Sequence, residues 1–562
     1  MEVTSNASLP NKKYRLEFGR KIVDFESAVK LYGSQRRAAE HTGIPRSTYH
    51  HLHDREKKFD MSEVTLQFFR TPDGIHFLHR LTLSIEFVIS HICGSGVGAI
   101  QKLYELSQLD KIIAASDGSL CDRLQRLESS VMEFGEIQFE QLSKNMPKKP
   151  IACALDETFP SDICLVGMEP VSNFILTEQF AQKRDSETWE QAMQGVLSAL
   201  PVNVVQVVSD EARALIKYCR DHLGAHHSPD LFHVQQEISK ATSAPMRSRL
   251  KSAQSGYDAA TQALQLIWDE KREIEALEVK PVGRPVNYEQ RLDDYAQVHQ
   301  EHLNHLAVTA HQKQSIQEAN KGIGDDYHPF DLENGLPKTP DNLKAELDAR
   351  FDTIQINAID AELSENSHKK LKKARKVTSS MVATLSFFWS WVEVEMKNLK
   401  LSEAGKSLFK ELLLLIAYLG LLMPKSRNAE EKSKRQKLYE TKMKMLESNK
   451  SWQAITAEQQ NTLMGSARHC ASVFQRSSSC VEGRNGQLSL MHHSRREISQ
   501  RRLSSLTVVH NYFIRRPDNT TAAERFFEQK HDDLFLWLLD RVDCPPLPAK
   551  KRVDRSRVKI VA

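Results

Sequence analysis

Two aspartates that lie far apart in the chain have the sequence setting of a divalent-metal site. Asp156 ends the apolar run "IACALD", and Asp210 follows the valine-rich run "VNVVQVVS". A charged carboxylate at the end of a buried strand is costly unless a partner compensates it. If the two runs are neighbouring strands, both aspartates lie at one edge of a sheet, where a divalent cation between them would relieve their repulsion. The other interpretation is a helix N-cap or turn residue, which is common for one such aspartate but less so for two.

Glu482 is our candidate for a third ligand. It lies in the polar segment "SSSCVEGRNGQLSL", and a helix through this segment places Asn485 on the same face as Glu482. Three carboxylates can hold two Mg²⁺ or Mn²⁺ ions, which activate water or a 3′-hydroxyl for attack on a phosphodiester. We therefore predict that Asp156, Asp210 and Glu482 are both the metal ligands and the catalytic residues. Other acids remain open as the third ligand, namely Glu362, Glu365, Glu393 and Glu395.

The elements that must position these residues follow from the hydrophobic pattern. Between residues 146 and 238, three β-type runs, a helical stretch and a fourth β-type run follow one another. Residues 61–145, 239–470 and 471–540 have helical patterns, and residues 541–562 form a Pro-rich, then basic tail. We expect an α+β or α/β fold in which a mixed-sheet core is interrupted by a large all-helical insertion.

The first 60 residues contain a candidate helix-turn-helix, "SQRRAAEHTGIPRSTYHHLHDR". Ala39 is small enough for two helices to approach, Gly43 suits a turn with positive φ, and Pro45 suits the start of a second helix. Ile44, Tyr49 and Leu52 have the spacing that would pack this second helix onto the first. Its outer face would carry residue types that contact phosphates and base edges: Arg46, Ser47, His50 and His51. An ordinary helical hairpin is the alternative interpretation.

Composition sets few limits on function. The chain has 562 residues, a formal net charge of +4 and eight cysteines without C-x-x-C spacing, so neither a zinc ribbon nor a disulfide framework is indicated. The longest apolar run, Leu412 to Met423, is too short to span a bilayer and predicts a buried helix. With no apolar signal near the first residue, we expect a cytoplasmic protein without a membrane partner.

The order of the expected elements resembles a known family. Three strands, a helix and a fourth strand, with Asp156 on the first strand and Asp210 at the end of the fourth, are similar to the RNase H-like core of DDE transposases and retroviral-type integrases. The segment "DLFH", from Asp230 to His233, resembles the [C/D]-x-x-H signature that follows the second catalytic aspartate in several transposase superfamilies. In those families a helical insertion separates this segment from the helix with the glutamate, as residues 239–470 would here.

The resemblance implies a function as well as a fold. It implies an insertion-sequence DNA transposase that binds element ends, hydrolyses 3′ phosphodiester bonds and joins the 3′-OH to target DNA with two Mg²⁺ or Mn²⁺ ions. Double-stranded DNA would be the partner, a homodimer or larger assembly the active form, and the nucleoid of a bacterial cell the location. Asp230, His233 and Asn485 would support the metal ligands, although His233 could equally be a structural histidine. Two other functions remain open: a DNA-binding regulator or domesticated transposase without catalysis, and a metal-dependent nuclease without strand transfer.

Further DNA contacts are predicted on both sides of the glutamate segment. The basic sequence after Glu482 would lie along the DNA backbone through Arg495, Arg496, Arg501 and Arg502. In the insertion, Trp389 and Trp391 are candidates for stacking on an unpaired base, with packing in the protein core as the alternative.

Overall fold

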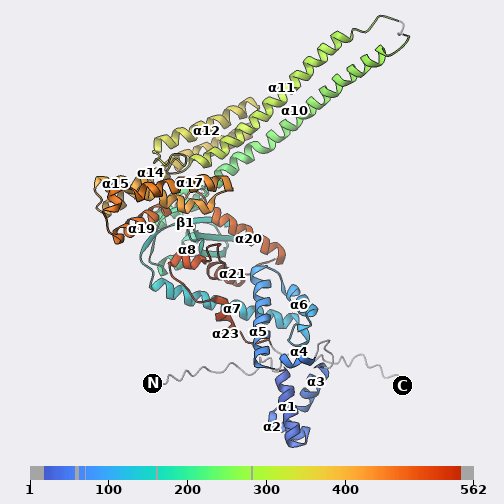
Figure 1. The fold of residues 1–562 in the computed structure, drawn as a ribbon, viewed down its shortest axis with the longest axis vertical. Coiled ribbons are helices and arrows are strands. Elements are labelled where there is room, and N and C mark those ends of the chain that lie inside the picture. The colour runs from blue at the N-terminus through green and yellow to red at the C-terminus, as the bar shows by residue number, and fades with distance from the viewer. Residues whose placement is uncertain are drawn as a thin grey trace.

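A five-stranded mixed sheet lies in the middle of the protein (Figure 1). The computed structural model describes residues 18–56, 63–69, 71–159, 162–279, 283–495 and 497–545. The strand order is β3-β2-β1-β4-β5; β2 is antiparallel to β1 and β3, whereas β4 is parallel to β1 and to β5. The strands are β1 (Lys149–Thr158), β2 (Ile163–Glu169), β3 (Phe174–Ala181), β4 (Val202–Ser209) and β5 (His226–Pro229). The predicted α+β class with a mixed sheet is therefore confirmed.

Different helices pack against the two faces of this sheet. Leu155 and Val207 belong to a large core that includes residues of α7 (Asp117–Lys144) and α8 (Ser186–Ala199). Ala154 and Val208 belong instead to a core with Val481 of α20 (Ser479–Arg495). Ala154 pairs with Val208 across β1 and β4. Because side chains alternate between faces, Asp156, two residues after Ala154 in β1, lies on the α20 face; Asp210 directly follows the last residue of β4.

The N-terminal helices form a small unit. They are α1 (Phe18–Tyr32), α2 (Gln35–Thr42) and α3 (Arg46–Glu56), which share buried Phe25, Ala38 and Ile44. Gly43 has φ 66°, which confirms the predicted turn. Ala39 packs against this core and is half-buried, whereas its neighbour Ala38 is the fully buried alanine. Further helices lead to the sheet: α4 (Glu63–Phe68), α5 (Pro72–Phe87), α6 (Val97–Leu106) and α7.

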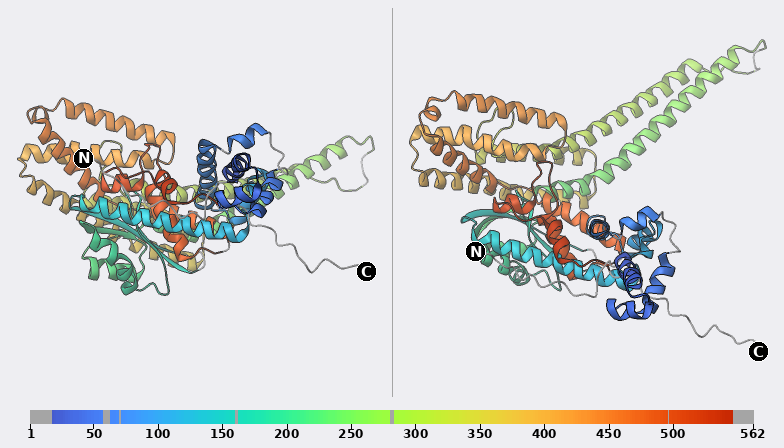
Figure 2. Two further views of the ribbon diagram at one scale, coloured as in Figure 1. Left: turned by 90° about the horizontal axis from the view of Figure 1, so that it is seen from below. Right: turned by 60° about the horizontal axis from the view of Figure 1, so that its bottom comes forward.

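A long helical hairpin projects from the body of the protein (Figures 1 and 2). It consists of α10 (Leu231–Glu275) and α11 (Tyr288–Asp326). The predicted boundary between core and insertion, at residues 238 and 239, lies inside α10, which runs on without a break. The helix therefore starts beside the sheet and ends far from it.

The rest of the insertion packs around one apolar core. Its helices are α12 (Pro340–Asp360), α13 (Glu365–Lys376), α14 (Thr378–Asn398), α15 (Glu403–Leu408), α16 (Leu414–Leu422), α17 (Ala429–Glu447), α18 (Lys450–Gln453) and α19 (Ala457–Val473). The helical stretch Glu403–Lys425 is long and apolar enough to cross a membrane, but 61% of its most apolar window is buried inside the protein. The predicted buried helix at Leu412–Met423 is confirmed.

The segment "YHPFD" after α11 closes this core. Tyr327 and Phe330 are fully buried, and His328 Nδ1 lies 2.6 Å from the hydroxyl of Tyr418. The remaining helices return to the sheet: α9 (Arg213–Lys217), α20, α21 (Gln500–Tyr512), α22 (Ala522–Phe527) and α23 (Leu534–Arg541).

Candidate metal centre

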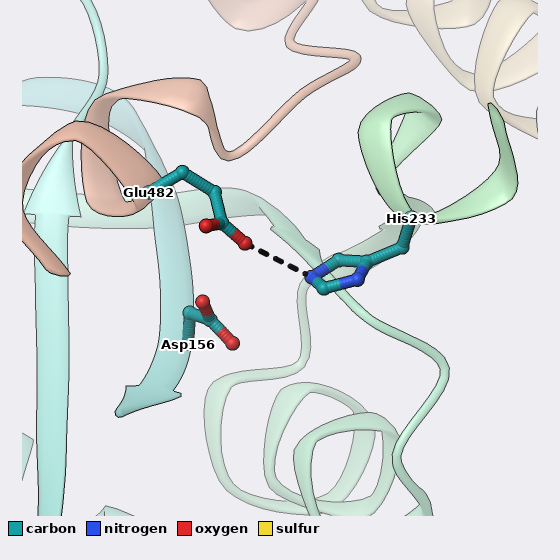
Figure 3. A group of neighbouring side chains, drawn as sticks. All are labelled: Asp156, His233 and Glu482. Carbon is teal, nitrogen blue, oxygen red and sulfur yellow. Dashed lines mark ion pairs between the residues drawn. The ribbon is translucent and has the colours of Figure 1, made fainter. Parts of the chain in front are cut away.

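Asp156, His233 and Glu482 converge at the carboxyl edge of the sheet (Figure 3). They come from β1, α10 and α20, and one potential ligand atom of each lies within 4.8 Å of the others. His233 Nε2 is 3.4 Å from Glu482 Oε1. The side chains of His233 and Glu482 are 31% and 32% exposed, so the group is open to solvent on one side.

The first turns of α10 and α20 are joined to each other. Asp230 caps α10, because its Oδ1 accepts a hydrogen bond of 2.8 Å from the backbone N–H of Phe232. Its Oδ2 accepts a hydrogen bond from the hydroxyl of Ser478, directly before α20. The N–H of Leu231 also donates to the carbonyl of Arg476 at 2.9 Å. These bonds hold His233 and Glu482 opposite each other, which gives Asp230 a positioning role.

Hydrogen bonds also join the starts of α10 and α20 to the sheet. Gln206 of β4 is fully buried, and its amide bonds both to the carbonyl of Gln475 at 2.7 Å and to the N–H of Gln475 at 3.1 Å. The N–H of Asp230 donates to the carbonyl of Ser209 at 2.9 Å. Sequence reasoning missed Gln206, Gln475 and Ser478. A signal for Gln206 existed, because a glutamine within a valine-rich strand requires a buried hydrogen-bond partner.

Asp156 is the most buried member of the group, with 9% exposed. Burial, together with the charges of Glu482 and Asp210, raises the pKa of its carboxyl from 3.8 to about 7. Asn485 Nδ2 donates a hydrogen bond of 2.9 Å to Asp156 Oδ2. Asn485 therefore lies where it can orient this carboxylate.

Asp210 lies outside the 4.8 Å group. Its Oδ1 accepts a hydrogen bond of 3.1 Å from the N–H of Ala212, which makes a tight turn before α9. Its charge still raises the pKa of Asp156, so the two carboxylates are within electrostatic range. The structure thus brings Asp156 and Glu482 together as predicted, but places His233 rather than Asp210 beside them.

The donor atoms of this group fit a divalent cation. His233 Nε2 is buried and makes no hydrogen bond among the described residues, and neither does Asn485 Oδ1. Carboxylate oxygens suit Mg²⁺ and Mn²⁺, and an imidazole nitrogen is a common ligand of first-row transition ions. Asp156, Glu482 and His233 could therefore hold one ion.

The arginines after Glu482 that are predicted to contact the DNA backbone lie in different environments. Arg502 is buried and pairs with Glu128 of α7, with 2.9 Å between Nη1 and Oε1. The prediction that Arg502 contacts DNA is wrong, because this arginine is buried in an ion pair between α21 and α7. Arg501 is partly exposed and donates to the hydroxyl of Ser129. The side chain of Arg495 and the whole of Arg496 lie outside the described residues.

The other predicted DNA contacts lie in two places. On α3, Arg46, Ser47 and His50 are exposed, and His51 is half-buried. In the insertion, both tryptophans are half-buried and pack against the apolar core, and Trp389 Nε1 donates to the carbonyl of Lys338 at 2.8 Å. These contacts favour the core-packing interpretation for Trp389 and Trp391.

Comparison with known proteins gives one partial match. Residues 409–554 match the model of a family of unknown function, DUF6399. This segment includes α20 with Glu482 and Asn485, but not Asp156 or His233. No curated protein matches the chain.

Proposed function

We propose that this protein is a metal-dependent DNA transposase with an RNase H-like core. The observation that carries the proposal is the convergence of Asp156 and Glu482, which lie on opposite sides of the helical insertion in sequence, within one potential ligand group. Such convergence is what a shared metal site requires, and buried carboxylates with raised pKa values are typical of functional sites.

The order of the elements also supports the proposal. Along the chain, β1, β2 and β3 are followed by α8 and then β4, with Asp156 on β1 and Asp210 directly after β4. This is the arrangement that the resemblance to RNase H-like transposases implies. The helical insertion lies between Asp210 and Glu482, as that resemblance also implies.

The residues suggest how the centre would act. A bound divalent ion would polarise a phosphodiester and lower the pKa of a water molecule or 3′-hydroxyl. Asp156 and Glu482 would hold it through their oxygens, and Asp156 would lose its proton as the ion binds. Asn485 would keep Asp156 oriented, and His233 would either bind the ion or fix Glu482.

The test is DNA cleavage by the purified protein. The substrate is a duplex that carries the sequences flanking its own gene, with Mg²⁺ or Mn²⁺ present. We expect Asp156→Asn and Glu482→Gln each to lower the cleavage rate by about 10³-fold, or about 4 kcal/mol at 1.36 kcal/mol per tenfold, while DNA binding is retained. Glu393→Gln, in the insertion, is the matched control and should cleave normally.

The other outcomes discriminate between functions. Unchanged cleavage in Asp156→Asn and Glu482→Gln would contradict the proposed site. Cleavage without joining of the 3′ end to a second duplex would indicate a nuclease, and DNA binding without cleavage by the unaltered protein would indicate a regulator.

A further inference from the structure

A cationic pocket of about 380 Å³ lies next to the candidate metal centre. Leu231 and Phe232 of α10 and Ser477 and Ser479 at the start of α20 form one side, and the end of α16 with the start of α17 forms the other. Its charged lining is four cations and one carboxylate: Lys425, Arg427, Arg435, Arg476 and Glu431. The pocket is therefore electropositive and lies between the helices of the insertion and the starts of α10 and α20.

Two of these cations already have anionic partners. Arg427 pairs with Asp325 and Glu431, and Arg435 pairs with the same Glu431 and donates to the carbonyl of Leu422 at 3.1 Å. Their charges are largely compensated within the protein, so they shape the pocket more than they attract a ligand.

Lys425 and Arg476 are not compensated in this way. Arg476 donates to the backbone carbonyls of Gly324 and Tyr327, which are neutral acceptors. The side chain of Lys425 makes neither a hydrogen bond nor an ion pair within the described part of the chain, and the residue still reaches solvent. Desolvation by the surrounding protein lowers the pKa of its ammonium group, Cys480 and the carboxylate of Glu169 oppose this shift, and the guanidinium groups of Arg516 and Arg476 add to it. A cation that is partly desolvated, has neighbouring cations and has no direct ion-pair partner is stabilised by an anionic ligand.

Along both α10 and α20, the residues that line the pocket lie close to those of the candidate metal centre. Phe232 precedes His233 in α10, and Ser479 lies three residues before Glu482 in α20, which is ~4.5 Å along the helix axis. An extended polyanion that presents a phosphodiester to Asp156 and Glu482 therefore passes the pocket at the adjacent part of its backbone.

We propose that this pocket binds a backbone phosphate of the DNA strand that is presented to the metal centre, with Lys425 as its main contact and Arg476 as the second. Through this contact the insertion positions the DNA for the core. The part concerning the metal centre rests on the proposed function, whereas the phosphate contact itself does not require catalysis.

The test compares DNA binding by Lys425→Met, Lys425→Arg and a control, Lys432→Met. Lys432 is exposed on α17 and does not line the pocket. A fluorescent duplex from the gene flanks is titrated in EDTA at several salt concentrations, so that no cleavage is needed. Each phosphate contact contributes about −0.9 to the slope of log Kobs against log salt concentration. We expect Lys425→Met to make that slope shallower by about 0.9 and to weaken binding roughly tenfold at low salt.

The controls make the result specific. Lys425→Arg should keep most of the slope, and Lys432→Met should match the unaltered protein. Equal slopes for Lys425→Met and the unaltered protein would overturn the proposal. If inorganic phosphate raises the melting temperature of the unaltered protein but not of Lys425→Met, while DNA binding is the same for both, the pocket binds free phosphate and the DNA contact is wrong.

Failure of this proposal is distinguishable from failure of the proposed function. A change in slope without any metal-dependent cleavage would support the pocket and contradict the catalytic role. Cleavage that depends on Asp156 and Glu482, with no change in slope for Lys425→Met, would support the catalytic role and overturn the pocket.

Discussion

Helix α20 contributes to two buried charged groups on the same face of the sheet, and they differ in how their charges are compensated. Two residues after Glu482, Arg484 forms a double hydrogen bond with Glu178 of β3, with both N–O distances 2.7 Å. Thr507 donates a further bond of 2.6 Å to Glu178. In the other group, Asp156 accepts a side-chain bond from Asn485 and lies beside the carboxylate of Glu482.

This difference separates a structural group from a candidate functional one. Glu178 and Asp156 are similarly buried, at 6% and 9% exposed. Glu178 has a guanidinium partner that compensates its charge, whereas burial beside Glu482 raises the pKa of Asp156 to about 7. Burial alone therefore does not distinguish the two carboxylates; what differs is the guanidinium partner of Glu178 and the raised pKa of Asp156.

The largest expected effect is on the compensated pair. Arg484→Ala leaves the Glu178 carboxylate buried without a cation, which should lower the free energy of unfolding by about 3–5 kcal/mol. Urea denaturation measures this. The double variant Glu178→Leu/Arg484→Leu should recover most of the loss, because two apolar side chains replace both charges. A loss of less than about 1 kcal/mol in the free energy of unfolding for Arg484→Ala would show that the Arg484–Glu178 pair does not stabilise the fold.

A smaller, pH-dependent effect is expected at Asp156. Its pKa is about 7 in the folded protein against an ordinary 3.8, so between these values the unfolded chain releases a proton that the folded protein keeps. In EDTA, the free energy of unfolding should therefore fall as the pH rises from about 4 to 7, by up to about 4 kcal/mol at 1.36 kcal/mol per pKa unit. Asp156→Asn removes this contribution and should flatten the profile. Equal pH profiles for the two proteins would contradict the raised pKa.

The smallest effect concerns the orientation of Asp156. Asn485→Ala removes the hydrogen bond to Asp156 Oδ2 and should weaken Mn²⁺ binding by about 10–100-fold, the usual cost of losing a residue that orients a ligand. Calorimetric titration measures the affinity. Gln487→Ala, an exposed neighbour on α20, is the matched control. Equal affinity for both variants would mean that Asn485 does not position the site.

Much of the sheet could be predicted because its strands are apolar runs with sharp ends. The runs that contain Asp156 and precede Asp210 lie next to each other as β1 and β4, as the sequence pattern predicts, but their register shifts between Ile151 and Ala152, which no local pattern indicates. Glu482 could be chosen only from its place after the insertion. Its meeting with Asp156 depends on the bonds from Asp230 to Ser478 and from Gln206 to Gln475, which join segments that no local pattern connects.

Other features depend on tertiary contacts. Strand β5, His226–Pro229, contains two histidines and a proline and has no strand pattern; it forms because it pairs with β4. The place of His233 beside Glu482 likewise depends on where α10 starts. The prediction of a DNA contact for Arg502 is wrong because a basic run does not show which of its arginines points inward, here to Glu128.

We propose above all that Asp156, His233 and Glu482 bind a divalent metal ion. Anomalous diffraction from crystals soaked in Mn²⁺ tests it most directly. We predict a peak within coordination distance of Asp156 and Glu482, with His233 Nε2 facing it, that is lost in Asp156→Asn. A second peak between Asp156 and Asp210 would support the two-ion form. A structure at saturating Mn²⁺ with no peak between Asp156 and Glu482 would contradict the account.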